Sequence, residues 1–372
     1  MKKHPMTSPV LLSLLLLLLA TPVLAQESGQ EPAQFEGLVE VSEVLLDVIA
    51  TDRKGRVIRG LGMEDFVVEE NGEPVPITSV SFYSTRYEGL EEAVDGAPTG
   101  EAVPEIPSSR YFILYFEDQR RNSNSLNRLM RQQMEAGRRA HDWIRDSLGP
   151  SDWVAVVSYD VKLIVHQDFT QDVGSLLKAV VEASQGKRPP EMKRSEYDRA
   201  ISGTAPALWR GLPDPTDLRD ETKRPYDAFR LLAEASRPIV GRKNLLYFGI
   251  GFGDLEPGGF SRGDQRFYPA MEQALNDNNV AVYPIDLTPS PVDHVQSHFL
   301  NQMALDSGGF YHFNIVNFIT PLTRISMENV GYYAISYRTE HPAGESGYRQ
   351  VTVKATNKKV KVRTRKGYKY GI

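Results

Sequence analysis

The most constraining feature of the sequence is an alternation of strand and helix patterns through its middle part. Residues 111–116 form a continuous apolar run, and residues 244–249 and 280–285 are also predicted to be strands. Runs of this kind are typical of strands that are covered on both faces. Residues 126–148 and 173–181 carry apolar side chains at helical spacing. Strands that alternate with helices predict a doubly wound, mainly parallel α/β sheet, with any ligand site at the carboxyl ends of its strands.

The two ends of the chain follow a different pattern, in which apolar residues recur at every second position. Residues 35–86 are predicted to form an N-terminal β-strand unit, in which Asn71-Gly72 is a hairpin signal. Residues 331–372 return to the same period. Because small isolated β units are marginally stable, we expect both ends to join in one small β-sandwich. The acid-, Gly- and Pro-rich residues 87–109 are predicted to link it to the α/β unit of residues 110–330.

The first 25 residues have the composition of a secretory signal peptide. Lys2 and Lys3 precede an apolar stretch over residues 10–20, and small residues end at Ala25. Cleavage there leaves a polar leader, residues 26–34, and a chain with no other segment long enough to span a membrane. We therefore expect a secreted or periplasmic protein; an uncleaved N-terminal anchor is the alternative.

Charge and cysteine content exclude several classes of function. Removal of Lys2 and Lys3 takes the formal net charge from −5 to −7. An acidic protein is a poor binder of nucleic acid, because phosphate contacts need concentrated Lys and Arg. The chain contains no cysteine, which excludes disulfides, thiolate catalysis and cysteine-based metal sites.

Several segments, taken in order, resemble the bacterial VWFA-related proteins of acidobacterial type, whose core is a von Willebrand factor A-type domain. The resemblance covers nearly all of the mature chain and implies an A-type α/β fold. The segments that carry it are DVIATDRKGRVIRGLGMEDFVVEENGEPVPI (residues 47–77), GRKNLLYFGIGFGD (241–254), ALNDNNVAVYPIDL (274–287), ALDSGG (304–309), YYAISY (332–337) and VKVRTRKGY (360–368).

A-type domains often bind partners through a metal-ion-dependent adhesion site, and the resemblance implies where its residues would lie. The family places Asp-x-Ser-x-Ser after the first strand, a Thr in a later loop and an Asp after the fourth strand. Asp118 matches the first position and Thr204 is a candidate for the Thr. Arg120 and Asn122 occupy the two Ser positions, and Ile250 occupies the last Asp position. The site is therefore expected to be degenerate.

Other oxygen-bearing side chains near these positions widen the candidate ligand-binding set. Asn122, Ser123, Ser125 and Asp254 join Asp118, Arg120 and Thr204 in it. Mg²⁺ prefers octahedral oxygen ligands, which the two basic side chains at positions 120 and 121 oppose. We expect no cofactor, with Mg²⁺ or Ca²⁺ held by Asp118 and Thr204 as the alternative. In a vestigial site, Asp118 would pair with an Arg, and Ser123 or Ser125 would cap the next helix.

Three further patterns suggest a ligand site, but each also has a simpler interpretation. The glycines of residues 249–253 are not followed by the helix that a dinucleotide site requires. His294 and His298 are four residues apart, a spacing compatible with zinc, but no third ligand is evident. The long polar insert, residues 185–224, is predicted to be a solvated mobile loop or a partner-binding loop.

These patterns contain no nucleophile elbow or other catalytic motif. The sequence therefore favours an exported non-enzymatic protein that binds a protein or cell-envelope ligand through the carboxyl edge of its A-like domain. One alternative is a carboxylate-based hydrolase of an envelope polymer, and another is a self-associating structural component of the envelope.

Overall fold

The architecture is described from a computed structural model. The predicted signal peptide, the predicted polar leader and most of the predicted 87–109 linker lie outside the described residues. The structure describes residues 39–84, 109–118, 126–190, 193–200, 203, 205–259, 261–288, 294–313, 315–342 and 344–371.

The central sheet has five strands in the order β11-β8-β5-β6-β7. Four of them run parallel, and the edge strand β7 runs antiparallel to β6. The predicted fold class is confirmed, because this mainly parallel sheet alternates with helices along the chain. The strands are β5 (Arg110–Glu117), β6 (Asp152–Tyr159), β7 (Leu163–Thr170), β8 (Lys243–Gly249) and β11 (Val280–Asp286).

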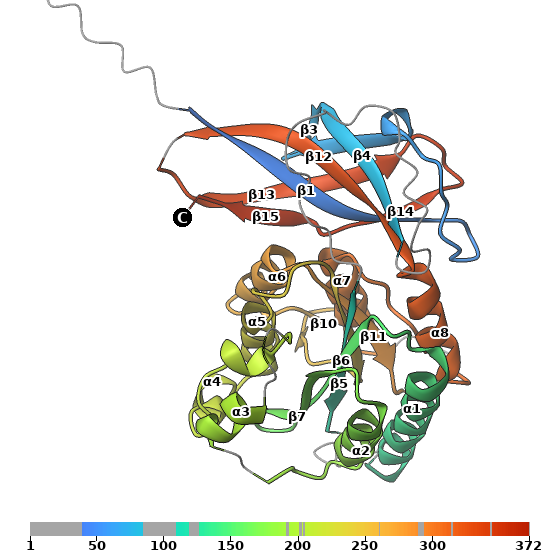
Figure 1. The fold of residues 1–372 in the computed structure, drawn as a ribbon, viewed down its shortest axis with the longest axis vertical. Helices are drawn as coiled ribbons and strands as arrows, with labels where there is room; N and C mark the ends of the chain where they lie inside the picture. The colour runs from blue at the N-terminus through green and yellow to red at the C-terminus, as the bar shows by residue number, and fades with distance from the viewer. Residues whose placement is uncertain are drawn as a thin grey trace, which may run out of the picture. The chain divides into compact units, whose positions relative to one another are not determined.

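Helices cover both faces of this sheet (Figure 1). The first face packs against three helices, α1 (Leu126–Ser147), α2 (Val173–Ser184) and α8 (Ile319–Glu328). The opposite face packs against α5 (Pro225–Ala235), α6 (Tyr268–Asp277) and α7 (Ser297–Ser307). Alternate residues of each strand enter the two apolar cores, which explains why these strands read as continuous apolar runs.

Two antiparallel sheets are built from strands of both chain ends. One has the order β14-β1-β12-β4 and the other β15-β13-β2-β3. Strand β1 pairs with β12 from Val39 opposite Pro342 to Val48 opposite Tyr333. The remaining bounds are β1 (Val39–Thr51), β2 (Phe66–Glu70), β3 (Glu73–Val75), β4 (Ile77–Ser84), β12 (Gly331–Pro342), β13 (Gly347–Ala355), β14 (Lys361–Arg363) and β15 (Gly367–Tyr370), with the 3-10 turn η1 (Met63–Asp65) before β2.

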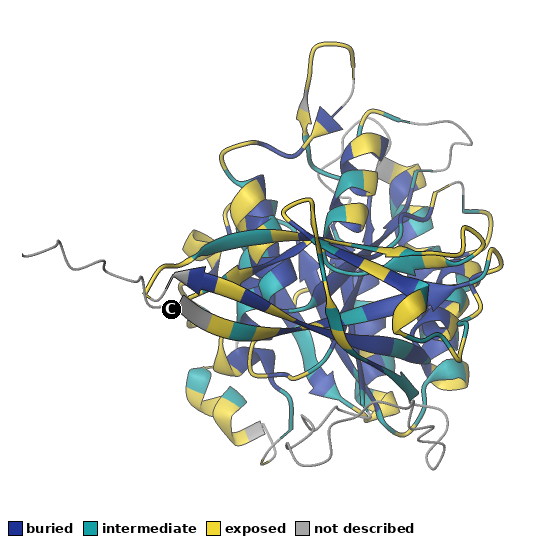
Figure 2. Ribbon diagram, turned by 90° about the horizontal axis from the view of Figure 1, so that it is seen from above, coloured by how far each residue is buried: buried dark blue, intermediate teal, exposed yellow. Residues whose placement is uncertain are grey.

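Buried and exposed residues alternate along several of these antiparallel strands (Figure 2), whereas residues 333–337 of β12 are all buried. The two inner faces share an apolar core centred on Leu46, Tyr333 and Tyr337, all three fully buried. The arrangement is that of a β-sandwich built from N- and C-terminal strands, as predicted. Residues 39–372 belong to one compact unit.

The insert of residues 185–224 differs from the predicted solvated loop. It contains α3 (Arg194–Ala200), the 3-10 turn η3 (Leu208–Arg210) and α4 (Leu218–Glu221). Leu208 and Trp209 are buried in the core on the α5 side of the sheet. Its apolar residues are too few and too irregularly spaced to give a periodic signal, so the sequence did not indicate that they pack.

Candidate functional site

The site follows from the way in which the chain leaves the two central strands. After β5 the chain continues through α1, on one face of the sheet, to β6. After β8 it continues through α6, on the opposite face, to β11. Neighbouring strands whose connections leave in opposite directions form a topological switch point, and ligands of open α/β sheets bind in the crevice there. In this protein the crevice lies beyond Glu117 at the end of β5 and Gly249 at the end of β8.

Glu117 connects the two strand ends at the switch point. Its Oε2 accepts a hydrogen bond from Tyr247 Oη at 2.7 Å and one from the Ile250 backbone N–H at 3.3 Å. Burial, together with the charge of Glu117, raises the pKa of Tyr247 well above its ordinary value. Tyr247 therefore keeps its proton and remains a donor. Glu117 acts here as a clamp between β5 and β8.

Asp118, the residue that begins the predicted adhesion motif, is largely withdrawn from solvent. Its side chain is 8% exposed, and its backbone N–H donates to the Tyr159 carbonyl at 2.8 Å. This bond joins the end of β5 to the end of β6. Asp118 therefore lies at the predicted edge of the sheet, with little of its carboxylate open to a ligand.

The other predicted site residues are only partly placed. Arg120, Asn122, Ser123, Ser125 and Thr204 lie outside the described residues. Asp254 lies in the short strand β9 (Asp254–Leu255), which pairs with β10 (Ser261–Arg262), and it is exposed.

Two features of the described residues bear on a metal site of the adhesion type. Ile250 stands where the distant acid would be, and its N–H is directed at Glu117. The space beside it is also filled, since a Cβ on Gly249 would lie 2.6 Å from Glu117 Oε2. Within the described part of the chain, no group of three or more His, Cys, Asp or Glu is arranged to hold a metal ion.

A second buried carboxylate, which the sequence analysis missed, lies at the end of β11. Asp286 Oδ2 accepts from Tyr311 Oη and from His294 Nε2, each at 2.7 Å. The Thr288 N–H donates to Asp286 Oδ1 at 2.8 Å. The segment VYPID, an apolar strand that ends in an acid, has the same pattern as the end of β5. Applying that criterion to every strand would have found Asp286.

The position of His294 argues against two roles, that of a general base and that of a zinc ligand paired with His298. Its Nδ1 accepts from the Gln296 N–H at 3.3 Å while Nε2 faces Asp286, so both ring nitrogens are engaged. A general base needs a free nitrogen toward its substrate. Helix α7 begins at Ser297, so His294 precedes the helix, and the helical spacing with His298 does not apply.

The glycine-containing segment after β8 forms a loop followed by a short hairpin. Gly251 has φ of +90°, and a Cβ there would lie 2.8 Å from the Gln296 side chain. Glycine is therefore required at this position both by its backbone conformation and by packing. No helix starts here, in agreement with the sequence, in which these glycines are not followed by a helix pattern.

Comparisons with known proteins give matches of fold. No protein-family model and no curated protein matches the chain. Among solved structures, the conserved hypothetical protein BatB from Bacteroides thetaiotaomicron is 15% identical, with 59% of this chain and 97% of that chain covered and a TM-score of 0.36. The SpRpn10 VWA domain is 13% identical over 58% of this chain and 94% of its own, with a TM-score of 0.32. The ArnB paralog VWA2 from Sulfolobus acidocaldarius is 11% identical over 89% and 74%, with a TM-score of 0.33.

At these identities and TM-scores the matches concern the fold alone and transfer no ligand. The fold of the domain is described by its sheet order, its antiparallel edge strand and the helices on both faces, without recourse to these matches. None of the helices among the described residues is both long and apolar enough to cross a membrane. The central part of the chain has a von Willebrand A-like fold with an antiparallel β-sandwich built from its two ends.

Proposed function

We propose that this is an exported, non-enzymatic binding protein whose A-like domain contacts a protein or cell-envelope ligand through its carboxyl edge. The contact surface would comprise the switch point at Glu117 and Asp118, the loop of residues 249–253 and Asp254. Residues 119–125 and 204, predicted from the sequence, would complete it.

The observation that carries this proposal is the clamp at the switch point. Glu117, Tyr247 and the Ile250 N–H hold the ends of β5 and β8 together with two hydrogen bonds. Such a clamp supports a rigid platform, and rigid sites lose less conformational freedom on binding. The carboxylate is already bonded within the protein, which favours recognition over catalysis.

The alternative of a carboxylate-based hydrolase has less support. Two carboxylates that act as acid and base must both reach the substrate. Glu117 and Asp286 instead accept two and three hydrogen bonds within the protein, and Asp118 is 8% exposed. Turnover of an envelope polymer by the wild-type protein, abolished by Asp118→Ala, would replace our proposal with the enzymatic one.

The test of binding compares two charge reversals at exposed carboxylates. Asp254→Lys changes a residue of the carboxyl edge. Asp220→Lys changes a residue of α4, and the Asp220 side chain is 77% exposed. The mature protein and both variants, each cross-linked in envelope preparations from the native source, are compared for the amount of captured component. We expect Asp254→Lys to reduce capture at least several-fold and Asp220→Lys to leave it unchanged. Equal capture by all three proteins would place the contact surface elsewhere.

Metal-free recognition is a separate part of the proposal. Calorimetric titration with Mg²⁺, Ca²⁺ and Mn²⁺ should give no binding tighter than millimolar. Tighter binding that is lost in Asp118→Ala would show that the adhesion site is functional. Sedimentation of the mature protein tests the structural alternative, since concentration-dependent self-association without any hetero-partner would favour an envelope scaffold.

A further inference from the structure

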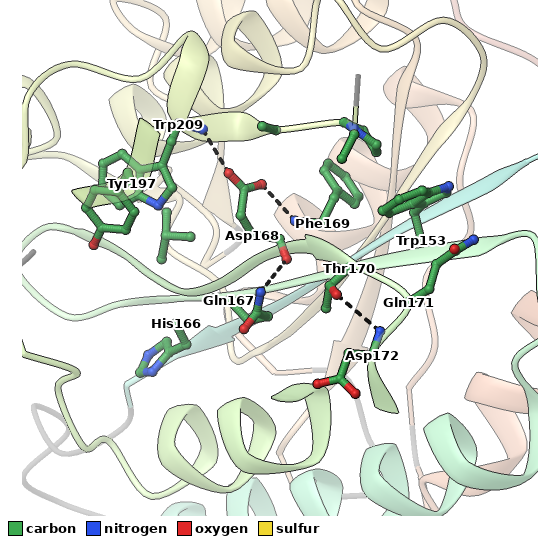
Figure 3. A pocket seen from close by; sticks show the side chains of 14 residues that line it. Trp153, His166, Gln167, Asp168, Phe169, Thr170, Gln171, Asp172, Tyr197 and Trp209 are labelled. Carbon is green, nitrogen blue, oxygen red and sulfur yellow. Dashed lines mark hydrogen bonds between the residues drawn. The ribbon is translucent and has the colours of Figure 1, made fainter. Parts of the chain in front are cut away.

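A pocket of about 430 Å³ runs along the outer side of the edge strand β7, from Val165 to Asp172. Figure 3 shows it from close by, with Trp209 and Tyr197 on one side of Asp168 and Trp153 on the other. Its volume is within the range of small-ligand sites, about 300–1,000 Å³.

The pocket and the switch point lie toward opposite ends of the sheet. Thr170 pairs with Val154, which in turn pairs with Phe112 near the start of β5. This part of the pocket therefore lies at the amino ends of the parallel strands. A ligand there would not use Glu117, Asp118 or the loop of residues 249–253, which belong to the proposed carboxyl-edge surface.

Asp168, a residue of β7, holds the 3-10 turn η3 against this strand. Its Oδ1 accepts from the Leu208 N–H at 2.8 Å, and its Oδ2 accepts from the Trp209 N–H at 3.0 Å. The Phe169 N–H donates to Oδ1 at 2.7 Å. The pairing of β7 with β6 shifts register at two points in this stretch, and such bulges redirect side chains at sites. The pocket is thus a built feature, held by a half-buried carboxylate.

Aromatic rings form the two sides of the pocket. Tyr197 and Trp209 are stacked with their centroids 3.9 Å apart at 27°. Tyr197 and Trp153 are half-buried and so present part of their rings. Faces of Trp and Tyr attract cations through the negative potential of the ring.

The charges around the pocket favour a cation. Asp168 and Asp172 are carboxylates, and the described residues that line the pocket include no Lys or Arg. Burial lowers the pKa of His166 to about 4, so its ring is neutral at pH 7. Burial raises the pKa of Asp168, which the three backbone N–H donors and the charge of Arg210 oppose. The Arg210 guanidinium donates to the carbonyls of Gly203 and Ala205.

We propose that this pocket binds an arginine side chain of a partner peptide. A guanidinium can lie flat on an aromatic face and present a fixed fork of N–H donors to a carboxylate, whereas an ammonium group is a compact point charge without a planar face. Asp168 Oδ2 accepts one backbone bond, which leaves acceptor capacity toward the pocket. Asp172 supplies the second negative charge at its exposed end.

The three tryptophans provide a direct readout. Trp153 and Trp209 line the pocket, whereas Trp143 is fully buried on the opposite face of the sheet. The mature protein, labelled with 5-fluorotryptophan, is titrated with N-acetyl-L-arginine methylamide and followed by ¹⁹F NMR. We expect the Trp153 and Trp209 signals to shift saturably and the Trp143 signal to stay in place.

The neutral isostere N-acetyl-L-citrulline methylamide is the matched ligand, and it should cause no saturable shift. The lysine counterpart should bind at least three-fold more weakly than the arginine probe. Absence of saturation by the arginine probe, or equal affinity for citrulline or lysine, would overturn the proposal. A response at Trp143 equal to that of the other two signals would indicate a general effect and would also overturn it.

Variants test the charge argument without disturbing Asp168. Gln171→Lys places a cation at an exposed position of the pocket and should weaken binding about ten-fold or more. Asp172→Asn removes a charge, keeps a residue that caps α2 equally well, and should weaken binding about two- to five-fold. Asn301→Lys, at an exposed position of α7 outside the pocket, is the control. Equal affinity in all four proteins would contradict an arginine site here.

Discussion

Lys243 allows a quantitative test of the fold, because it is a lysine placed inside the protein. Its side chain is 2% exposed at the start of β8, and Nζ donates to the Ile239 carbonyl at 2.8 Å. Burial lowers the pKa of Lys243 from 10.5 to about 7, although the charge of Asp47 partly opposes this. Replacing it, as Lys243→Met, removes the titrating group from the core.

The direction of the effect follows from proton binding. Between about pH 7 and pH 10.5 the unfolded chain holds a proton on Lys243 that the folded protein has released. The free energy of unfolding therefore rises with pH across this window, and this contribution is lost as pH falls toward 7. A pKa difference of 10.5 − 7 = 3.5 corresponds to roughly 5 kcal/mol, at about 1.4 kcal/mol for each pH unit.

Urea unfolding of the wild type and of Lys243→Met at pH 6, 8 and 10 measures this difference. We expect the variant to be more stable than the wild type at pH 6, with the difference falling by several kcal/mol by pH 10. The Ile239 carbonyl loses its donor in the variant, but that loss is the same at every pH. Lys178→Met, at an exposed position of α2, should show no such trend. A difference between wild type and Lys243→Met that is constant from pH 6 to 10 would refute the reasoning.

Three further changes in stability can be measured by the same unfolding assay. Glu70→Ala leaves Arg349 without its buried partner and should lower the free energy of unfolding by roughly 3–5 kcal/mol. Burial raises the pKa of Glu70, but hydrogen bonds from hydroxyl groups and from Arg349 outweigh it and leave the pKa lowered. The stabilisation is therefore present above the ordinary pKa of 4.5 and is lost as pH falls below it. If the difference in free energy of unfolding between the wild type and Glu70→Ala did not change in acid, this reasoning would be wrong. Gly309→Ala places a Cβ 1.8 Å from the Val282 carbonyl oxygen and should cost about 1–3 kcal/mol or more, so unchanged stability would show that the backbone yields easily. Trp143→Phe removes an indole N–H donor to a buried serine hydroxyl at 2.7 Å and leaves a void, which should cost about 1–3 kcal/mol; no loss would mean that the core repacks.

Strand and helix patterns predicted the central sheet because its strands are buried on both faces. The run at residues 111–116 falls within β5, with Phe112 and Leu114 on one face and Ile113 and Tyr115 on the other. The end of α7 is also a local feature, since Gly308 has φ of +79° at its C-cap and glycine is the usual residue there. These features depend on local sequence, so they can be recognised without knowledge of the tertiary structure.

The insert shows where local pattern fails. Leu208 and Trp209 have no periodic apolar neighbours, yet they are 0% and 3% exposed. What holds them is Asp168, whose sequence separation from them is 40 and 41 residues. A single half-buried carboxylate that accepts backbone N–H groups leaves no signature in the sequence.

The sequence by itself determined the α/β class, the antiparallel strands at both ends and the carboxyl edge as the place to look for a site. It also predicted that the adhesion motif is degenerate, because Arg120, Asn122 and Ile250 stand where the resemblance implies Ser, Ser and Asp. Only the tertiary structure decided what the carboxylates at that edge do. Glu117 meets Tyr247 across 130 residues of sequence, and a hydrogen bond over such a separation depends on the neighbouring positions of β5 and β8. Whether an acid is open to a ligand or bonded within the protein is therefore a property of the fold, which residue order alone does not reveal.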